Sequence, residues 1–230
     1  MSNILILTGA GISAESGLGT FRDKDGLWAQ YDLEDVATPE GFQRNPRLVH
    51  NFYNARRDNC LNATPNAAHS ALARLQDGHP GTVTIVTQNV DDLHERGGAR
   101  DVIHMHGSLL GALCARCETR WPAPREMGAL DPCPNCNLPA TRPDIVWFGE
   151  MPHRMNEIYD ALDRADLFVA IGTSGNVYPA AGFVTQARQS DIPTLELNLA
   201  PSDTISAFDE ARFGPATEVV PAWVAEWVAA

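Results

Sequence analysis

Short apolar runs rich in β-branched residues recur along the chain and alternate with longer segments whose apolar residues have helical spacing. This pattern is typical of parallel strands that are buried on both faces and joined by helices. We therefore predict an α/β fold built on a doubly wound parallel sheet. Residues 220–230 are expected to form a short amphipathic helix that packs Trp223 and Trp227 on the core. The runs assigned to the sheet are residues 4–8, 82–87, 167–172 and 194–197.

Two insertions interrupt the sheet pattern and predict a second, smaller lobe. Residues 26–62 are polar with helical spacing, whereas residues 109–147 contain four cysteines and too many prolines for regular helix. We expect both insertions to belong to one domain that spans residues 1–230. The large lobe of that domain is predicted to comprise residues 1–25, 63–108 and 148–230.

Composition narrows the class of protein. The chain has 230 residues, of which 44% are hydrophobic, and a formal net charge of -12 from 17 basic and 29 acidic residues. The negative charge argues against binding to nucleic acid phosphates. An acidic surface would suit basic partners such as lysine-rich protein segments, although it could serve solubility alone. No apolar run is long enough to span a membrane, and the N-terminal run is too short for a signal peptide.

Four of the five cysteines form two Cys-x-x-Cys pairs that are fifteen residues apart. This spacing is typical of a tetrahedral zinc site with four thiolate ligands, which leaves no coordination position for water. We therefore predict one structural Zn²⁺ ion and an intracellular, cytoplasmic location, because such thiols suit a reducing compartment. A redox-active cysteine pair is the alternative. The predicted ligands are Cys114, Cys117, Cys133 and Cys136.

The first predicted strand runs into a glycine-containing turn at residues 9–14. Such a turn lets the backbone approach a phosphate closely and aims the amides of a following helix at it. This favours a dinucleotide site, with a tight turn that binds no ligand as the alternative. The Gly-x-Gly-x-x-Ala spacing also fits a dehydrogenase, which needs an acidic residue after a second strand about 20 positions on. Glu34 and Asp35 follow a polar loop instead, so the dehydrogenase lacks its ribose anchor.

A polar cluster follows the second predicted strand, at the edge of the sheet where ligands of such folds bind. It contains Gln88, Asn89 and Asp91, although Asn89 and Asp91 could instead cap a helix. Shortly after it, His104 and His106 are spaced to point to the same side of an extended segment. A histidine can act as a general base near neutral pH. His106 could also be a core residue or a zinc ligand, although four cysteines already complete a zinc site.

The order of these motifs resembles the sirtuins, the NAD-dependent protein lysine deacylases, over nearly the whole chain. The resemblance implies a Rossmann-like large lobe, a small zinc-binding lobe, NAD as co-substrate, and acylated-lysine proteins and peptides as partners. It also implies that His106 is the catalytic base. The cofactor contacts that it implies are Gly9, Ala10, Gly11, Ile12, Ser13, Glu15, Phe21, Arg22, Gln88, Asn89, Val90, Asp91, Gly172, Thr173, Ser174, Asn198 and Ala216.

Tyr53 and Arg56 are three residues apart on one face of a predicted helix. A phenol and a guanidinium could bind a carboxylate together, whereas packing and a surface ion pair are their ordinary roles. Tyr-x-x-Arg matches the sirtuins that accept negatively charged acyl groups such as succinyl and malonyl. The other residues that the resemblance places near the substrate are Phe148, Gly149, Glu150, Gly175 and Asn176, which could also belong to ordinary loops.

The activity that the resemblance implies is removal of acetyl, and of succinyl or malonyl, groups from protein lysines. Its products would be free lysine, nicotinamide and an acylated ADP-ribose. Two other classes would use the same cofactor site. A mono-ADP-ribosyltransferase would leave ADP-ribose on a protein, and an NAD-binding adaptor would bind the cofactor without releasing nicotinamide.

Overall fold

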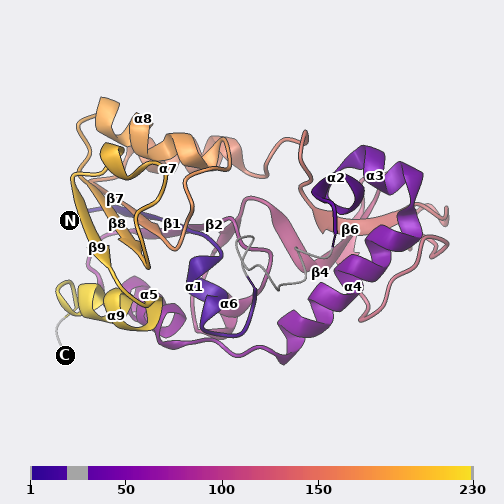
Figure 1. The fold of residues 1–230 in the computed structure, drawn as a ribbon, viewed down its shortest axis with the longest axis horizontal. Coiled ribbons are helices and arrows are strands. Elements are labelled where there is room, and N and C mark those ends of the chain that lie inside the picture. The colour runs from indigo at the N-terminus through magenta and orange to yellow at the C-terminus, as the bar shows by residue number, and fades with distance from the viewer. Residues whose placement is uncertain (1, 20–30, 229–230) are drawn as a thin grey trace.

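The computed structural model describes residues 2–19 and 31–228. Figure 1 shows a larger part, in which helices cover a parallel sheet and near which both termini lie, and a smaller part with its own sheet and three helices. No helix among the described residues combines the length and the hydrophobicity that crossing a bilayer requires.

The larger sheet has six strands in the order β3-β2-β1-β7-β8-β9, and every neighbouring pair is parallel. The predicted doubly wound parallel sheet is confirmed, and all four predicted runs form strands. Of the two edge strands, β3 lies within residues 102–107, which the sequence predicts to be extended, whereas β9 was not predicted because it is not buried. The strands are β1 (Ile4–Thr8), β2 (Val83–Thr87), β3 (Ile103–His104), β7 (Leu167–Ile171), β8 (Thr194–Asn198) and β9 (Glu210–Phe213).

Successive residues of β1 serve opposite faces of this sheet. Ile4 and Ile6 pack under α5 and α9, whereas Leu5 and Leu7 pack under α7 and α8. This alternation is the side-chain period of a strand, and burial on both faces explains why the run is apolar throughout. The covering helices are α5 (Ala67–Gly78), α7 (Met155–Asp163), α8 (Phe183–Gln189) and α9 (Ala216–Ala225).

The C-terminal helix differs from the prediction in its bounds. It begins at Ala216, four residues before the predicted start, and ends at Ala225. Pro221 lies inside the helix, at its sixth residue, and its missing N–H leaves the Thr217 carbonyl without the usual i→i−4 hydrogen bond. Trp223 is buried and Trp227, which follows the helix, is half-buried against the same core, as predicted.

The smaller part packs helices on an antiparallel sheet with the order β5-β4-β6. Residues 109–147 contain no helix, as their prolines predicted, but the first strand of this sheet begins slightly earlier, at Gly107. Its core includes Phe52, Tyr53 and Trp147. The elements are α2 (Leu33–Val36), α3 (Pro39–Arg44), α4 (Pro46–Asn62), β4 (Gly107–Cys114), β5 (Arg120–Pro122) and β6 (Thr141–Ile145).

The order of the larger sheet reverses between β1 and β7, which is the position where such folds bind ligands. The turn after β1 packs tightly there, because Gly9 N donates to Ile171 O at 2.9 Å and Gly11 N to Gly172 O at 2.8 Å. A Cβ atom on Gly11 would lie 2.7 Å from Gly172 Cα. The glycines of the motif are therefore required by contacts within the protein, in addition to any approach to a ligand.

We predict that Gly11→Ala lowers the free energy of unfolding by about 1–3 kcal/mol, because both segments that collide are backbone. Urea or thermal denaturation measures this change. Gly182→Ala is the matched control, since its Cβ would meet nothing closer than 3.7 Å and its φ of -82° suits any residue. A Gly11→Ala protein as stable as the control would show that the turn can move away from β7.

Candidate functional site

The candidate cofactor residues converge at the carboxyl edge of the larger sheet, after β1, β2, β7 and β8. Gln88 N donates to Thr8 O at 2.9 Å, and Gln88 Nε2 donates to Thr173 Oγ1 at 3.0 Å. Asn198 Nδ2 donates to Thr173 O at 2.8 Å. Four segments that are far apart in sequence are thus connected by hydrogen bonds at one edge.

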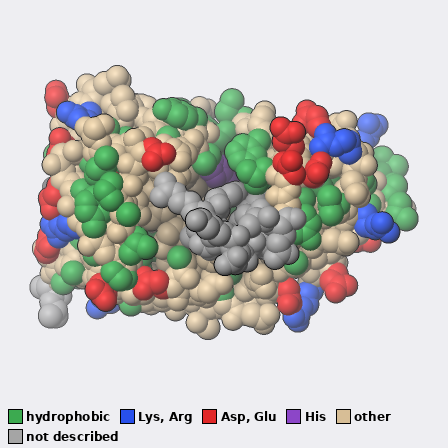
Figure 2. Space-filling view, viewed as in Figure 1, with side chains coloured by type: hydrophobic (Ala, Val, Ile, Leu, Met, Phe, Trp, Pro, Cys, Tyr) green, Lys and Arg blue, Asp and Glu red, His purple; other side chains and the backbone are tan. Residues whose placement is uncertain are grey.

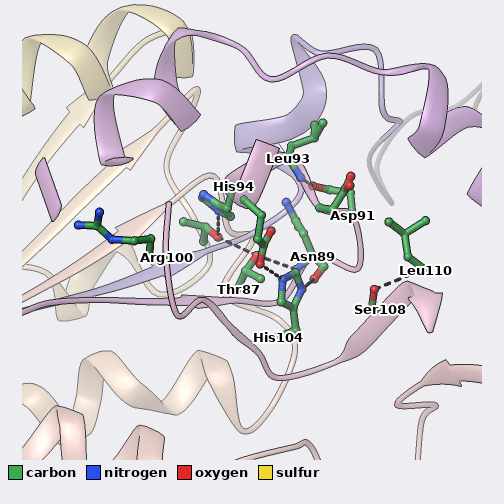
Figure 3. A network of polar contacts seen from close by, with 12 residues as sticks. Thr87, Asn89, Asp91, Leu93, His94, Arg100, His104, Ser108 and Leu110 are labelled. Atoms are coloured by element: carbon green, nitrogen blue, oxygen red, sulfur yellow. Dashed lines mark hydrogen bonds and ion pairs between the residues drawn. The ribbon is translucent and has the colours of Figure 1, made fainter. Parts of the chain in front are cut away.

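The polar cluster after β2 is bonded to the glycine turn. Asn89 Nδ2 donates to Gly9 O and to Ser13 Oγ, each at 3.1 Å, and Ser13 Oγ donates to Asp91 Oδ2 at 3.1 Å. Asp91 Oδ1 also accepts the N–H of Leu93, the first residue of α6 (Leu93–Arg96), at 3.1 Å, whereas the N-cap residue of this helix is Asp92. Figure 3 shows Asn89 and Asp91 on this loop. Burial raises the pKa of Asp91, although its hydrogen bonds oppose that effect.

Two buried histidines that the sequence analysis did not single out contact residues next to this cluster. His94 Nε2 lies 2.9 Å from Thr8 Oγ1, which donates to Thr87 Oγ1 at 2.8 Å. His69 Nε2 lies 3.4 Å from Ser13 Oγ. Burial lowers the pKa of His94 well below its ordinary value and that of His69 to about 4, so both rings are neutral at pH 7. The only sequence signal is that His94 lies three residues after Asp91 in the chain, and His69 has no comparable signal.

His106 is placed to act as a base. Its Nδ1 lies 3.2 Å from Gln88 O, and because a carbonyl oxygen only accepts, this nitrogen carries the hydrogen of the neutral ring. Its Nε2 is then the acceptor. Burial lowers the pKa of His106 despite the bond to Gln88, so the neutral form dominates at pH 7. Figure 2 shows a hollow between the two parts of the molecule, with histidine surface at its floor.

His104 faces the same loop but has the opposite protonation preference. Its Nε2 lies 2.7 Å from Glu95 Oε1 and its Nδ1 3.3 Å from Asn89 O, so both ring nitrogens face acceptors (Figure 3). Burial opposes charge on this ring, but the contact with Glu95 outweighs it and raises the pKa of His104. Of these two histidines, His106 is therefore the one available as a base.

The four sulfur atoms of the cysteine quartet lie within 4.8 Å of one another. Cys114 and Cys136 Sγ are 3.7 Å apart, and Cys117 and Cys133 Sγ are 3.6 Å apart. A tetrahedron with Zn–S bonds of about 2.3 Å has edges of about 3.8 Å, so the spacing fits zinc. All five cysteines are free, and a disulfide bond is therefore not what joins the two pairs.

The two Cys-x-x-Cys pairs have the same backbone geometry. In each, the first cysteine's sulfur accepts an N–H from the residue two positions later at 3.4 Å. The residue after the second cysteine has a left-handed φ, 59° at Glu118 and 58° at Asn137. Backbone N–H groups aimed at sulfur stabilise thiolate ligands, so the residues fit a structural zinc ion.

The predicted acyl-binding pair is brought together in the core of the smaller part. Tyr53 is fully buried, and its Oη accepts the Trp147 Nε1–H at 3.1 Å, which leaves its own O–H to donate. The Arg56 guanidinium carbon lies 5.6 and 5.7 Å from the ring centres of Phe52 and Tyr53. Burial raises the pKa of Tyr53 and lowers that of Arg56. The phenol is thus neutral and the guanidinium remains charged.

The other predicted substrate residues lie on two loops. Phe148 is 49% exposed, and its N–H donates to Ala37 O at 2.9 Å. The Glu150 carboxylate is paired with Arg142 at 2.7 Å and accepts the Trp147 N–H at 2.9 Å, which stabilises this loop. Gly149 and Gly175 have left-handed φ values, and Asn176 is exposed.

Three predicted cofactor residues are not among those that meet at the carboxyl edge of the larger sheet in the described structure. Glu15 accepts the N–H and the Oγ1–H of Thr217 at 2.9 and 2.7 Å, and so caps the first turn of α9 beside Ala216. Phe21 and Arg22 lie outside the described residues.

The fold and the site define a Rossmann-like α/β protein with a four-cysteine metal cluster. Glu34 and Asp35 lie in the helix α2, so they give no support for a dehydrogenase, whose acidic residue ends a strand. Residues 9–179 match the sequence model of the Sir2 family. The chain therefore belongs to the Sir2 family, as the motif order predicted.

Curated relatives match over nearly the full length of the chain. A protein of Caulobacter vibrioides named NAD-dependent protein deacylase is 59% identical over 96% of this chain and 94% of its own. One of Vibrio cholerae with the same name is 54% identical over 99% of this chain and 94% of its own.

Solved structures agree with this assignment. A Sir2 homologue mutant in complex with ADP ribose has a TM-score of 0.89 at 38% identity, covering 97% of this chain and 91% of that one. A Sir2 homologue–NAD complex has a TM-score of 0.86 at 38% identity, covering 97% and 88%.

We predict that the purified protein contains one zinc ion per chain and that a chelator lowers its melting temperature. The ion would join the turn at Cys114 and Cys117 to the turn at Cys133 and Cys136, and structural zinc contributes directly to folding free energy. Elemental analysis and thermal denaturation measure both effects. Restoration of the melting temperature by Zn²⁺ but not by Mg²⁺ is the control, and a metal-free protein with an unchanged melting temperature would contradict the prediction.

Proposed function

We propose that the chain is an NAD-dependent protein lysine deacylase that removes acetyl, succinyl and malonyl groups. The observation that carries the proposal is the loop after β2. Its Gln88 carbonyl orients His106, while its Asn89 and Asp91 are bonded to the glycine turn. One loop thus connects a neutral imidazole to a dinucleotide-type site. Relatives that are 52–59% identical and named NAD-dependent protein deacylase support the same activity.

We assign the residues of this site the following roles. NAD, when bound, supplies a ribose carbon whose bond to nicotinamide breaks. The residues at the carboxyl edge bind and orient NAD, and Asp91 holds its carboxamide. His106 Nε2 accepts a proton from a ribose hydroxyl, because its Nδ1 is already occupied by Gln88 O. Orientation and exclusion of water supply much of the acceleration, and a positioned base adds roughly 10²–10⁴-fold. The zinc cluster has a structural role only.

The substrate is an acylated lysine on a protein or peptide. Phe148 lines its channel, and the loops after β6 and β7 add hydrogen bonds to the peptide backbone. Tyr53 and Arg56 bind the carboxylate of a succinyl or malonyl group through one O–H and one guanidinium. Free cysteines in a metal cluster support an intracellular, cytoplasmic location.

The first experiment is mass spectrometry of peptides with acetyl- or succinyl-lysine, incubated with the protein with and without NAD. We expect NAD-dependent loss of both groups, and a loss of rate of about 10²–10⁴-fold in His106→Ala. Burial lowers the pKa of His106, so the rate is expected to be constant from pH 8 to 7 and to fall in acid, where the pH passes below the lowered pKa and the ring gains a proton. NAD consumption with a gain of protein mass would instead indicate ADP-ribosyl transfer.

Arg56→Met is expected to lower the ratio of succinyl to acetyl kcat/KM by roughly tenfold or more, since it removes a charge-assisted hydrogen bond. Steady-state kinetics with the two peptides measure the ratio. Arg47→Met is the matched control, because Arg47 is exposed on the first turn of the same helix. An unchanged ratio in Arg56→Met would remove the proposed selector role.

A further inference from the structure

Arg57, on the inner face of α4, is a buried cation that contacts no carboxylate within residues 2–19 and 31–228. Its side chain is 1% exposed. Nε donates to Leu109 O at 2.6 Å, and Nη1 donates to Asn54 Oδ1 at 2.7 Å and to Arg125 O at 3.3 Å. All three acceptors are neutral. Nη2 is buried and has no hydrogen-bond partner among the described residues.

Such an arrangement is unusual, because buried charges are normally paired and an unpaired one is costly. Burial lowers the pKa of Arg57, but a guanidinium remains charged in proteins. The neighbouring Asp58 does not neutralise it, since Asp58 pairs with the exposed side chain of Arg125. The positive charge of Arg57 is therefore uncompensated by its described neighbours.

Arg57 is also connected, through Leu109, to the loop after β2 that carries the polar cluster. The pairing of β4 with β6 is interrupted between Ser108 and Ala112, which leaves the backbone groups of Leu109 outside the ladder. Leu109 N donates to Val90 O at 2.8 Å, in the loop of the polar cluster, and Leu109 O accepts from Arg57. One residue of β4 thus joins α4 to the loop that orients His106.

Arg57 immediately follows Arg56 on the helix that carries the acyl-binding pair, with consecutive Cα atoms about 3.8 Å apart. Two guanidinium groups and the neutral phenol of Tyr53 therefore share one short stretch of α4. Charges inside a protein are screened by salt much less than exposed ones, so the charge of Arg57 acts on groups bound near Arg56.

We propose that Arg57 is a further specificity-determining residue, whose uncompensated buried charge favours a negatively charged acyl group at the Tyr53–Arg56 site. The inference rests on the proposed deacylase function and concerns acyl groups that end in a carboxylate. Arg57 does not touch the acyl group. It acts through the electrostatic potential that its charge creates at Tyr53 and Arg56, and through its contact with β4, which positions α4.

The test compares Arg57→Met with Arg57→Lys. Arg57→Met removes the charge at similar volume, and we expect its succinyl-to-acetyl kcat/KM ratio to fall roughly three- to tenfold, mainly through the KM of the succinyl peptide. Arg57→Lys keeps the charge but has a single donor group, so its ratio should stay near that of the wild type even if both rates fall. Melting temperatures establish that each variant is folded.

If Arg57→Met lowers kcat/KM equally for the succinyl and the acetyl peptide, Arg57 has a purely structural role and the inference is overturned. A ratio in Arg57→Lys as low as in Arg57→Met would also overturn it, because the charge would then not be the cause. If Arg57→Met does not fold, Arg57→Gln takes its place as the uncharged variant. Arg47→Met, which removes an exposed charge from the same helix, is expected to leave the ratio unchanged.

Arg56→Met separates this inference from the proposed function. If the ratio is unchanged in both Arg56→Met and Arg57→Met, the selector assignment itself is wrong. If it falls only in Arg56→Met, the proposed function stands and Arg57 has no part in selection.

Discussion

The contact between the turn after β1 and the first residue after β7 is the constraint on which the site depends. At this point the strand order reverses, and the backbone amides of Gly9 and Gly11 donate to the carbonyl groups of Ile171 and Gly172. A side chain on Gly11 would separate the two segments. A displaced turn would in turn strain the hydrogen bonds that join its Ser13 to Asn89 and Asp91.

Hydrogen-bond direction explains why the buried histidines near this contact must be neutral. Thr8 Oγ1 donates to Thr87, so it accepts from His94 Nε2, and the opposite nitrogen of His94 has no described partner. A second proton on that ring would be a buried donor without an acceptor. The low pKa of His94 therefore follows from the same network that fixes the polar cluster.

The sequence was sufficient to predict the central strands and the zinc ligands, because both leave local patterns. Apolar runs indicate strands that are buried on both faces, and the spacing of the cysteines indicates a tetrahedral metal site. The start of α9, the edge strand β9 and the role of His94 leave no such pattern. They depend on contacts such as that of Glu15 with Thr217, between residues about 200 positions apart, which no local spacing encodes. The sequence analysis also missed the buried charge of Arg57. An arginine on a helix is usually exposed, and the contacts that bury this one come from residues distant in the chain.

A metal ion at the cysteine quartet would bear on the position of His106, although it would bind at the opposite end of β4. Cys114 ends β4 and pairs with Thr141, while at the other end of the same ladder Gly107 pairs with Ile145. His106 immediately precedes that end, and its carbonyl accepts the Val146 N–H at 3.0 Å. A strand of eight residues spans roughly 25 Å, so a zinc ion at one end would fix a ladder that adjoins His106, the proposed base, at the other. His106 is thus held by the smaller sheet through its backbone and by the larger sheet through Gln88.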